Sequence, residues 1–102
     1  MPIKTTPAEV SKKAIELFKE QTTAAMEPYV VLRHDHNYPY YYTRGYDYEI
    51  QSRKHGRWLL LLSENFFELW PLSEVRSVFC YVKGVWVDSR RSRERNRIVI
   101  ID

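Results

Sequence analysis

Aromatic and polar side chains alternate along residues 38–51, which is the most regular pattern in the chain. The even positions carry tyrosine or isoleucine, and the odd positions are mostly polar, with Tyr41 as the exception. Because a β-strand points successive side chains to opposite faces, this pattern predicts one long, half-buried strand. We expect the even-numbered tyrosines to be substantially more buried than the polar residues between and after them. The tyrosines are Tyr40, Tyr42, Tyr46 and Tyr48, and the polar residues are Asp47, Glu49 and Gln51.

Gly45 interrupts this strand and is a candidate position for a β-bulge, because glycine is frequent at bulges. The alternative is a hairpin that turns at Arg44 and Gly45. Such a hairpin would place tyrosines on one face with Asp47 and Glu49, so we rank it second.

One helix is predicted before the strands, over about residues 7–26. Thr6 is a suitable N-cap, Pro7 suits the first helical position, and Glu9 completes a capping box. Pro28 disfavours helical geometry in the residue before it, so the helix should end by about Met26. Apolar side chains recur at helical spacing and form one stripe that needs a cover; its members are Val10, Ala14, Leu17 and Phe18.

The chain after Pro28 is predicted to form strands, over about residues 29–101. The expected strands are 29–33, 38–51, 57–63, 66–70, 78–82, 85–88 and 98–101, with a helical turn near 72–76. The clearest hairpin turns at Lys83 and Gly84. This order predicts a single α+β domain over residues 1–102, with the helix packed on a mostly antiparallel meander of about five to seven strands.

Large apolar side chains are frequent in the second half of the chain; they are Trp58, Phe66, Phe67, Trp70, Phe79 and Trp86. We expect the helix to cover a face that holds Leu60, Leu62, the even-numbered tyrosines and either Val78 and Val82 or Phe79 and Tyr81. One helix covers only one face of a sheet. A second subunit over the other face would make the protein a homodimer. The alternative is that residues 72–76 and the N-terminal residues cover it.

The composition bounds the class of protein. Apolar residues make up 44% of the 102 residues and charged residues 28%, which excludes general disorder and an integral membrane protein. The longest apolar run, residues 58–62, is too short to span a bilayer, and residues 1–6 lack the apolar core of a signal peptide. We therefore expect cytoplasmic residence. Cys80 is the only cysteine, and we expect a buried, inert thiol.

Positive charge is concentrated near the C-terminus, although the net charge is only +3. Five arginines fall within eight residues: Arg90, Arg91, Arg93, Arg95 and Arg97. A second basic set, Arg53, Lys54 and Arg57, occupies the predicted turn after the tyrosine strand. Arginine binds phosphate bidentately and stacks on bases, so these residues predict contact with nucleic acid, either DNA or RNA. The arginine segment lies between two predicted strands, so the sheet should set its position. The alternative is a solvated connection whose charges pair with Glu94, Asp88 and other acids and which protects the sheet edge.

Two histidines, His34 and His36, flank Asp35 and resemble the beginning of a zinc or copper site. Residues 34–39 also have the composition of a turn, and a solvated turn is the favoured interpretation. The sequence predicts neither a metal nor a small-molecule cofactor.

The leading hypothesis is therefore a small, non-catalytic nucleic-acid-binding protein. One alternative is a protein-interaction module, such as a viral, plasmid or accessory protein, that binds a partner through an aromatic sheet face. The other is a metal-independent ribonuclease-like enzyme, in which an acid, a base and cations surround the phosphate. The residues available for that chemistry are Glu49, His55, Arg57 and Arg44.

Overall fold

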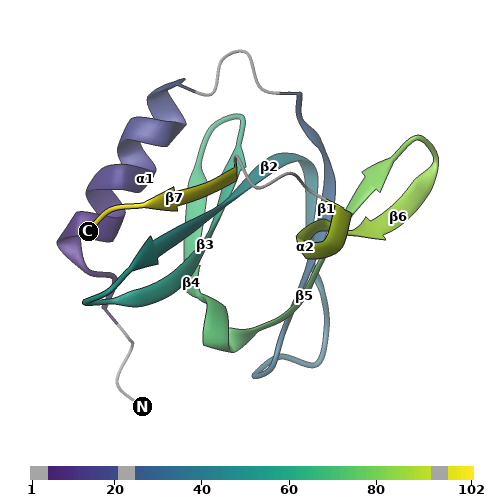
Figure 1. Cartoon of the computed structure of the whole chain (residues 1–102). Coiled ribbons are helices and arrows are strands. Elements are labelled where there is room, and N and C mark those ends of the chain that lie inside the picture. Colours follow the sequence, from purple (N-terminus) through teal and green to yellow (C-terminus); the bar gives the residue numbers. More distant parts are fainter. Residues whose placement is uncertain (1–4, 21–24, 93–96) are drawn as a thin grey trace.

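The computed structural model describes residues 5–20, 25–92 and 97–102. Its helices are α1 (Ala8–Glu20), the 3₁₀ helix η2 (Leu72–Glu74) and the short α2 (Ser89–Ser92). Its strands are β1 (Glu27–Arg33), β2 (Tyr40–Ser52), β3 (Gly56–Ser63), β4 (Phe67–Pro71), β5 (Val75–Val82), β6 (Val85–Asp88) and β7 (Ile98–Ile100). The predicted α+β fold is confirmed: an N-terminal helix packs on a mostly antiparallel sheet that has seven strands within the described ranges (Figure 1).

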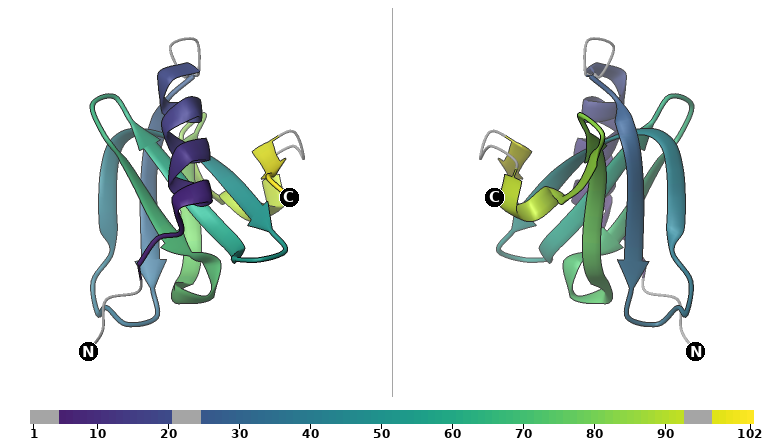
Figure 2. Two further views of the ribbon diagram at one scale, coloured as in Figure 1. Left: turned by 90° about the vertical axis from the view of Figure 1, so that its left-hand side faces the viewer. Right: turned by 90° about the vertical axis from the view of Figure 1, so that its right-hand side faces the viewer.

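Strand β2 is central because three other strands pair with it. The N-terminal half of β2 pairs antiparallel with β1. Its C-terminal half pairs antiparallel with β3 and, over residues 49–51, also parallel with β7. The antiparallel path runs β4-β3-β2-β1-β5-β6. This change of partners along β2 lets the sheet curl. Figure 1 and Figure 2 show α1 beside β3 and β4, away from the β5–β6 hairpin.

A β-bulge divides β2 into two halves. Glu27 pairs with Gly45, whereas Tyr29 pairs with Tyr42, so β2 contains one residue more than β1 between these two pairs. The bulge confirms the expectation at Gly45 and shows that β2 is one strand, not a hairpin. An extra residue reverses the side-chain parity beyond it.

The reversed parity overturns the predicted faces of the tyrosine strand. Tyr42 packs into the inner core, whereas Tyr46 and Tyr48 pack on the α1 side. Asp47 therefore lies on the inner side, where it is only 9% exposed. The prediction that the four even-numbered tyrosines are more buried than Asp47 is wrong, because Tyr40, Tyr46 and Tyr48 are only half-buried.

Two apolar clusters lie on the two faces of the sheet. The outer cluster holds α1 against β2, β3 and β4, and its buried members are Val10, Ala14, Ile50, Trp58, Leu60 and Leu62. The inner cluster is enclosed by the curl of the sheet, and its buried members are Tyr29, Val31, Tyr42, Leu59, Leu61, Trp70, Val75, Val78 and Cys80. The expected helix-facing set was therefore wrong for Tyr40, Tyr42 and Val78, which belong to the inner cluster.

This enclosure removes the argument on which the homodimer was predicted. Successive residues of β3 alternate between the two clusters, and all of residues 58–62 are buried within one chain. The homodimer itself stays a prediction.

Several local predictions are confirmed. The β5–β6 hairpin turns at Lys83 and Gly84, which have φ values of 51° and 83°. η2 forms the predicted helical turn, and Cys80 is fully buried. Helix α1 begins at Ala8, one residue after the predicted start. It buries Val10 and Ala14, whereas Leu17 and Phe18 of the predicted stripe are half-buried against the outer cluster. Its predicted end near Met26 depends on residues 21–24, which lie outside the described residues.

Candidate nucleic-acid interface

The basic turn after β2 is fixed by side-chain hydrogen bonds. Asp102 accepts from the backbone N–H of Arg53 at 2.6 Å and from the hydroxyl of Ser52 at 2.7 Å. The Ser52 hydroxyl in turn accepts from the backbone N–H of His55 at 3.0 Å. These bonds hold the pKa of Asp102 below its usual range. The turn therefore presents Arg53 and Lys54, both exposed, from an ordered backbone.

Arg57 stands directly after this turn, at the start of β3. Its guanidinium donates to both carboxylate oxygens of Glu49, at 2.9 and 3.1 Å. Burial raises the pKa of Glu49, but hydrogen bonds from Arg57 and Gln51 outweigh that effect and leave the pKa below its usual range. The Arg57 side chain remains 61% exposed, so it can contact a ligand while it is paired.

Arg90 joins this region from the other end of the sequence. It lies in α2, where its backbone N–H donates to Asp88 and its side chain donates to the carbonyl oxygen of Val75 at 3.1 Å. Arg57 and Arg90 line one open hollow of about 500 Å³, together with His55 and residues 71–73. One residue from each basic segment, Arg57 and Arg90, therefore lies at the same hollow.

A second hollow extends the basic surface. It has a volume of about 520 Å³, and Arg53, Arg57 and Asp102 are among the residues that line it. Arg57 is common to both hollows. We call the exposed cations that line the two hollows, together with the exposed Lys54 of the adjoining turn, the basic face; they are Arg53, Lys54, Arg57 and Arg90.

Carboxylates offset much of the local charge of the basic face. Glu9 is bonded to His55, Glu49 to Arg57, Asp88 to the backbone N–H of Arg90, and Asp102 to the turn. These four carboxylates equal the four cations in number, so any excess of positive charge comes from the arginine segment that follows. The adjoining Arg91, Arg93 and Arg95 add three positive charges to the same part of the chain. The Arg91 side chain and the whole of Arg93 and Arg95 lie outside the described residues.

Asp47 fixes both ends of the arginine segment to β2. Its carboxylate accepts from the Ser89 hydroxyl at 2.5 Å and from the Arg97 guanidinium at 2.9 Å. The Tyr29 hydroxyl also donates to it, at 2.5 Å. We call these four residues, Asp47, Ser89, Arg97 and Tyr29, the Asp47 anchor.

Arg97 is committed to this anchor. Besides its ion pair with Asp47, its guanidinium lies 3.7 Å from the centroid of the Tyr46 ring. Its side chain is only 16% exposed. We therefore assign Arg97 to holding the segment, and leave phosphate contact as a prediction for the other basic residues.

The sequence did not reveal the anchor, because an aspartate at an odd position of an alternating strand is ordinarily solvent-facing. The sequence signal for the anchor is the bulge expected at Gly45, because an extra residue there turns the side chain of Asp47 to the opposite face of the sheet. Ser89, which is 1% exposed, had no sequence signal of its own.

The structure brings together three of the four residues of the ribonuclease-like alternative. Glu49 is paired with Arg57, and His55 lines the same hollow as Arg57. The His55 ring is bonded to Glu9, and Arg44 pairs with Glu64 at the other end of β3. The ribonuclease-like function stays a prediction. His34 lies in a turn, and the His36 ring contacts the Tyr40 hydroxyl. Among the residues that the structure describes, no three histidine, cysteine or acidic side chains are grouped so as to hold a metal ion.

Comparison of the chain with protein-family models, with curated proteins and with solved structures finds no match. No helix in the described part of the chain has the length and apolar character needed to cross a membrane. The functional argument therefore rests on the geometry of the basic face.

Proposed function

We propose that this protein binds nucleic acid through the basic face and the arginine segment that adjoins it, without catalysing a reaction. The observation that carries the proposal is the convergence of Arg57 and Arg90 on one hollow, although they are far apart in the sequence. Cations that gather from separate elements on one ordered surface are the electrostatic footprint of a polyanion-binding protein. A nucleic-acid ligand is also compatible with the cytoplasmic residence that the sequence predicts.

The two hollows suit the phosphate backbone more than base edges. Each is open, and Arg57 between them can contact phosphates of one strand with its exposed guanidinium. Phosphate contacts fix the position of a protein on nucleic acid but carry no sequence information. We therefore propose binding with little sequence preference, to DNA or RNA.

Rigid presentation supports the same proposal. Asp102 orders the turn that carries Arg53 and Lys54, and the Asp47 anchor ties both ends of the arginine segment to β2. A cation on an ordered backbone loses less conformational freedom when it binds than one on a free tail. The anchor also fixes the direction in which the segment leaves the sheet at Ser89.

The test is a fluorescence-anisotropy titration of short duplex DNA, single-stranded DNA and RNA at several salt concentrations. We expect log Kd to depend linearly on log salt for the wild type. The triple variant Arg53→Gln, Arg57→Gln, Arg90→Gln should lower the slope on duplex DNA by roughly 0.9 for each lost contact, or about 2.7 in total. The loss of affinity should be similar across sequences.

Arg44→Gln is the matched control. Arg44 is exposed and paired with a glutamate, as Arg57 is, but it lies at the opposite end of β3. Its replacement should leave affinity and salt slope unchanged. Absence of salt-dependent binding by the wild type, or an equal loss in the control, would refute the proposal.

A further inference from the structure

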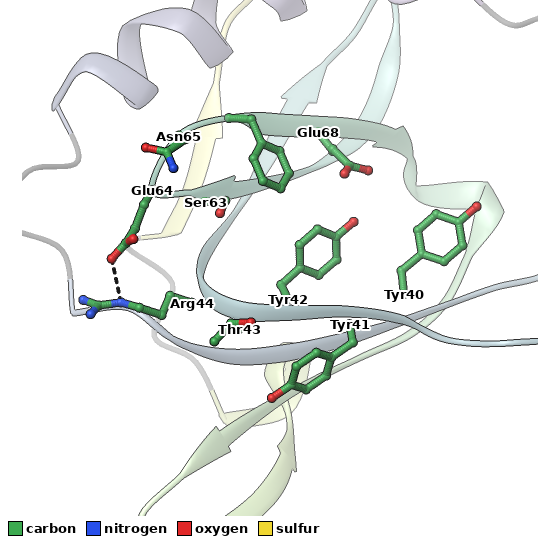
Figure 3. A pocket seen from close by; sticks show the side chains of 10 residues that line it. Tyr40, Tyr41, Tyr42, Thr43, Arg44, Ser63, Glu64, Asn65 and Glu68 are labelled. Carbon is green, nitrogen blue, oxygen red and sulfur yellow. Dashed lines mark ion pairs between the residues drawn. The ribbon is translucent and has the colours of Figure 1, made fainter.

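A third hollow lies beside the N-terminal half of β2, at the end of β3 that is opposite to the basic face. It has a volume of about 470 Å³ and is open to one side. Tyr40 and Tyr42 of β2 form part of its wall, and Glu68 faces Tyr42 from β4 (Figure 3). Phe66, from the turn between β3 and β4, also lines it. We call it the aromatic hollow. The basic face contributes no residue to it.

The Tyr42 hydroxyl is buried and faces Glu68. Tyr42 is 7% exposed, and its hydroxyl makes no hydrogen bond of standard geometry among the described residues. In Figure 3 this hydroxyl points toward the carboxylate of Glu68. Burial, followed by the charge of Glu68 and the hydrogen-bonding interaction of its carboxylate with this hydroxyl, raises the pKa of Tyr42 well above its usual range. The phenol is therefore neutral, and its oxygen is available to accept a hydrogen bond.

The walls of the hollow attract cations. Aromatic faces carry negative quadrupole potential. The Tyr42 and Phe66 rings lie 6.4 Å apart, at an angle of 41°. The neighbouring aromatic surface already holds one cation of the chain: the Arg33 guanidinium lies 5.7 Å from the Tyr40 ring and 5.8 Å from the Trp70 ring.

The acidic groups of the hollow differ in their partners. Glu64 is paired with Arg44 at 2.9 Å, as the dashed line in Figure 3 marks. Glu68 forms no ion pair with the arginines of this region that the structure describes: Arg44 pairs with Glu64, and Arg33 pairs with Asp35 and Glu74. Its carboxylate therefore stands next to the Tyr42 hydroxyl without an ion-pair partner in the described part of the chain. This combination calls for a group that is positively charged and donates hydrogen bonds.

In the described part of the chain, residues 40–44 of β2 have a neighbouring strand on one edge only. β1 pairs with Tyr40 and Tyr42 on one edge of β2, but on the other edge the pairing with β3 begins only at Gly45. Strand β4 is likewise the end of the antiparallel path. An extended segment of a second polypeptide can dock against such an open edge and present a side chain to the hollow.

We propose that the aromatic hollow binds the ammonium group of a lysine side chain carried by an extended segment of a partner protein. The ammonium donates to the Glu68 carboxylate and the Tyr42 oxygen, and lies against the Tyr42 and Phe66 rings. A nucleic acid is disfavoured here, because Glu68 and Glu64 would repel its phosphates.

The test uses the full chain and a capped, otherwise uncharged heptapeptide with one central lysine. Binding is followed by chemical-shift changes in ¹H–¹⁵N spectra. We expect saturable changes confined to residues 40–44 and 63–68. Acetylation of the lysine, which removes its charge, should weaken binding by about tenfold or more, and n-butylammonium should shift the same signals at higher concentration.

Two variants test the assigned contacts. Glu68→Gln should weaken binding of the lysine peptide by about fivefold, through loss of the charge. Tyr42→Phe should weaken it by about threefold and also raise the melting temperature of the free protein, because it removes a buried hydroxyl that makes no hydrogen bond of standard geometry. A merely structural role of this hydroxyl would not produce opposite changes in affinity and stability. Arg57→Gln, which tests the basic face, should leave peptide binding unchanged.

Three results would overturn the inference. The acetylated peptide binds as tightly as the lysine peptide, the two variants retain wild-type affinity for the peptide, or single-stranded nucleic acid shifts the same signals and displaces the peptide. None of these outcomes depends on whether the basic face binds nucleic acid.

Discussion

Replacement of Asp47 by asparagine tests the anchor between β2 and the arginine segment. The substitution keeps the size and one carbonyl acceptor of the side chain, but it removes the negative charge. In the wild type that charge is shared among Arg97 at 2.9 Å, Ser89 at 2.5 Å and Tyr29 at 2.5 Å. The side chains of Asp47 and Arg97 are 13% and 16% exposed, so the lost partner is not replaced by bulk water without rearrangement.

The expected cost follows from this burial. Removing one member of a buried ion pair costs about 3–5 kcal/mol, because the other charge is left uncompensated. Arg97 keeps its contact with the Tyr46 ring and is not fully buried, so the low end of that range applies. We expect Asp47→Asn to lower the free energy of unfolding by about 3 kcal/mol. For a domain of this size, this loss corresponds to a melting temperature lower by about 12–24 °C.

Urea denaturation followed by tryptophan fluorescence at neutral pH measures this change. Asp35→Asn is the control, because Asp35 also pairs with an arginine but its side chain is 52% exposed. An exposed pair contributes only about 0–1 kcal/mol, so the control should remain close to wild type. The double variant Asp47→Asn, Arg97→Met should be less destabilised than the two single variants added together.

A loss below about 1 kcal/mol in Asp47→Asn would refute the anchor, since a surface ion pair would explain it equally well. So would strict additivity with Arg97→Met, which would mean that the two side chains do not interact.

Two further predictions concern β2. Glu49→Gln removes the carboxylate that is paired with Arg57. Nucleic-acid affinity should therefore rise, and the salt slope on duplex DNA should steepen by up to roughly 0.9. A loss of affinity in the anisotropy titration would contradict the role of Arg57. Gly45→Ala places a Cβ 3.2 Å from the Leu62 carbonyl oxygen and 3.3 Å from the Tyr29 ring. Urea denaturation should therefore show a free energy of unfolding that is lower by about 1–2 kcal/mol. A stabilised variant would mean that the bulge has room for a side chain.

The sequence predicted the elements well because each has a local cause. The Lys83-Gly84 turn requires positive φ values, and the short apolar run of residues 58–62 is typical of an interior strand. The faces of β2 were predicted less well, because the face on which a side chain lies depends on every residue that precedes it in the strand. A single extra residue before Gly45 exchanged the environments of every side chain after it.

The same reasoning explains which parts of the basic face were foreseen. Arg57 and Arg90 were recognisable as basic residues near predicted turns, but their meeting depends on the pairing of β1 with β5 and on the path of the chain after β6. That pairing joins segments more than forty residues apart, and no local pattern encodes it.

The bulge also connects the fold to the proposed function. If β2 alternated without interruption, Asp47 would face α1 and the outer apolar cluster, where a carboxylate has no partner and its burial is costly. The extra residue turns Asp47 to the inner side instead, where it meets Tyr29, Ser89 and Arg97. The tyrosines on either side of the bulge are then divided between two tasks. Tyr46 stacks on Arg97 at the anchor, and Tyr42 supplies the buried hydroxyl of the aromatic hollow. One backbone irregularity thus separates the residues of the Asp47 anchor, which adjoins the basic face at Ser89, from those of the aromatic hollow. The basic face and the aromatic hollow should be separable by substitution because they share no residue.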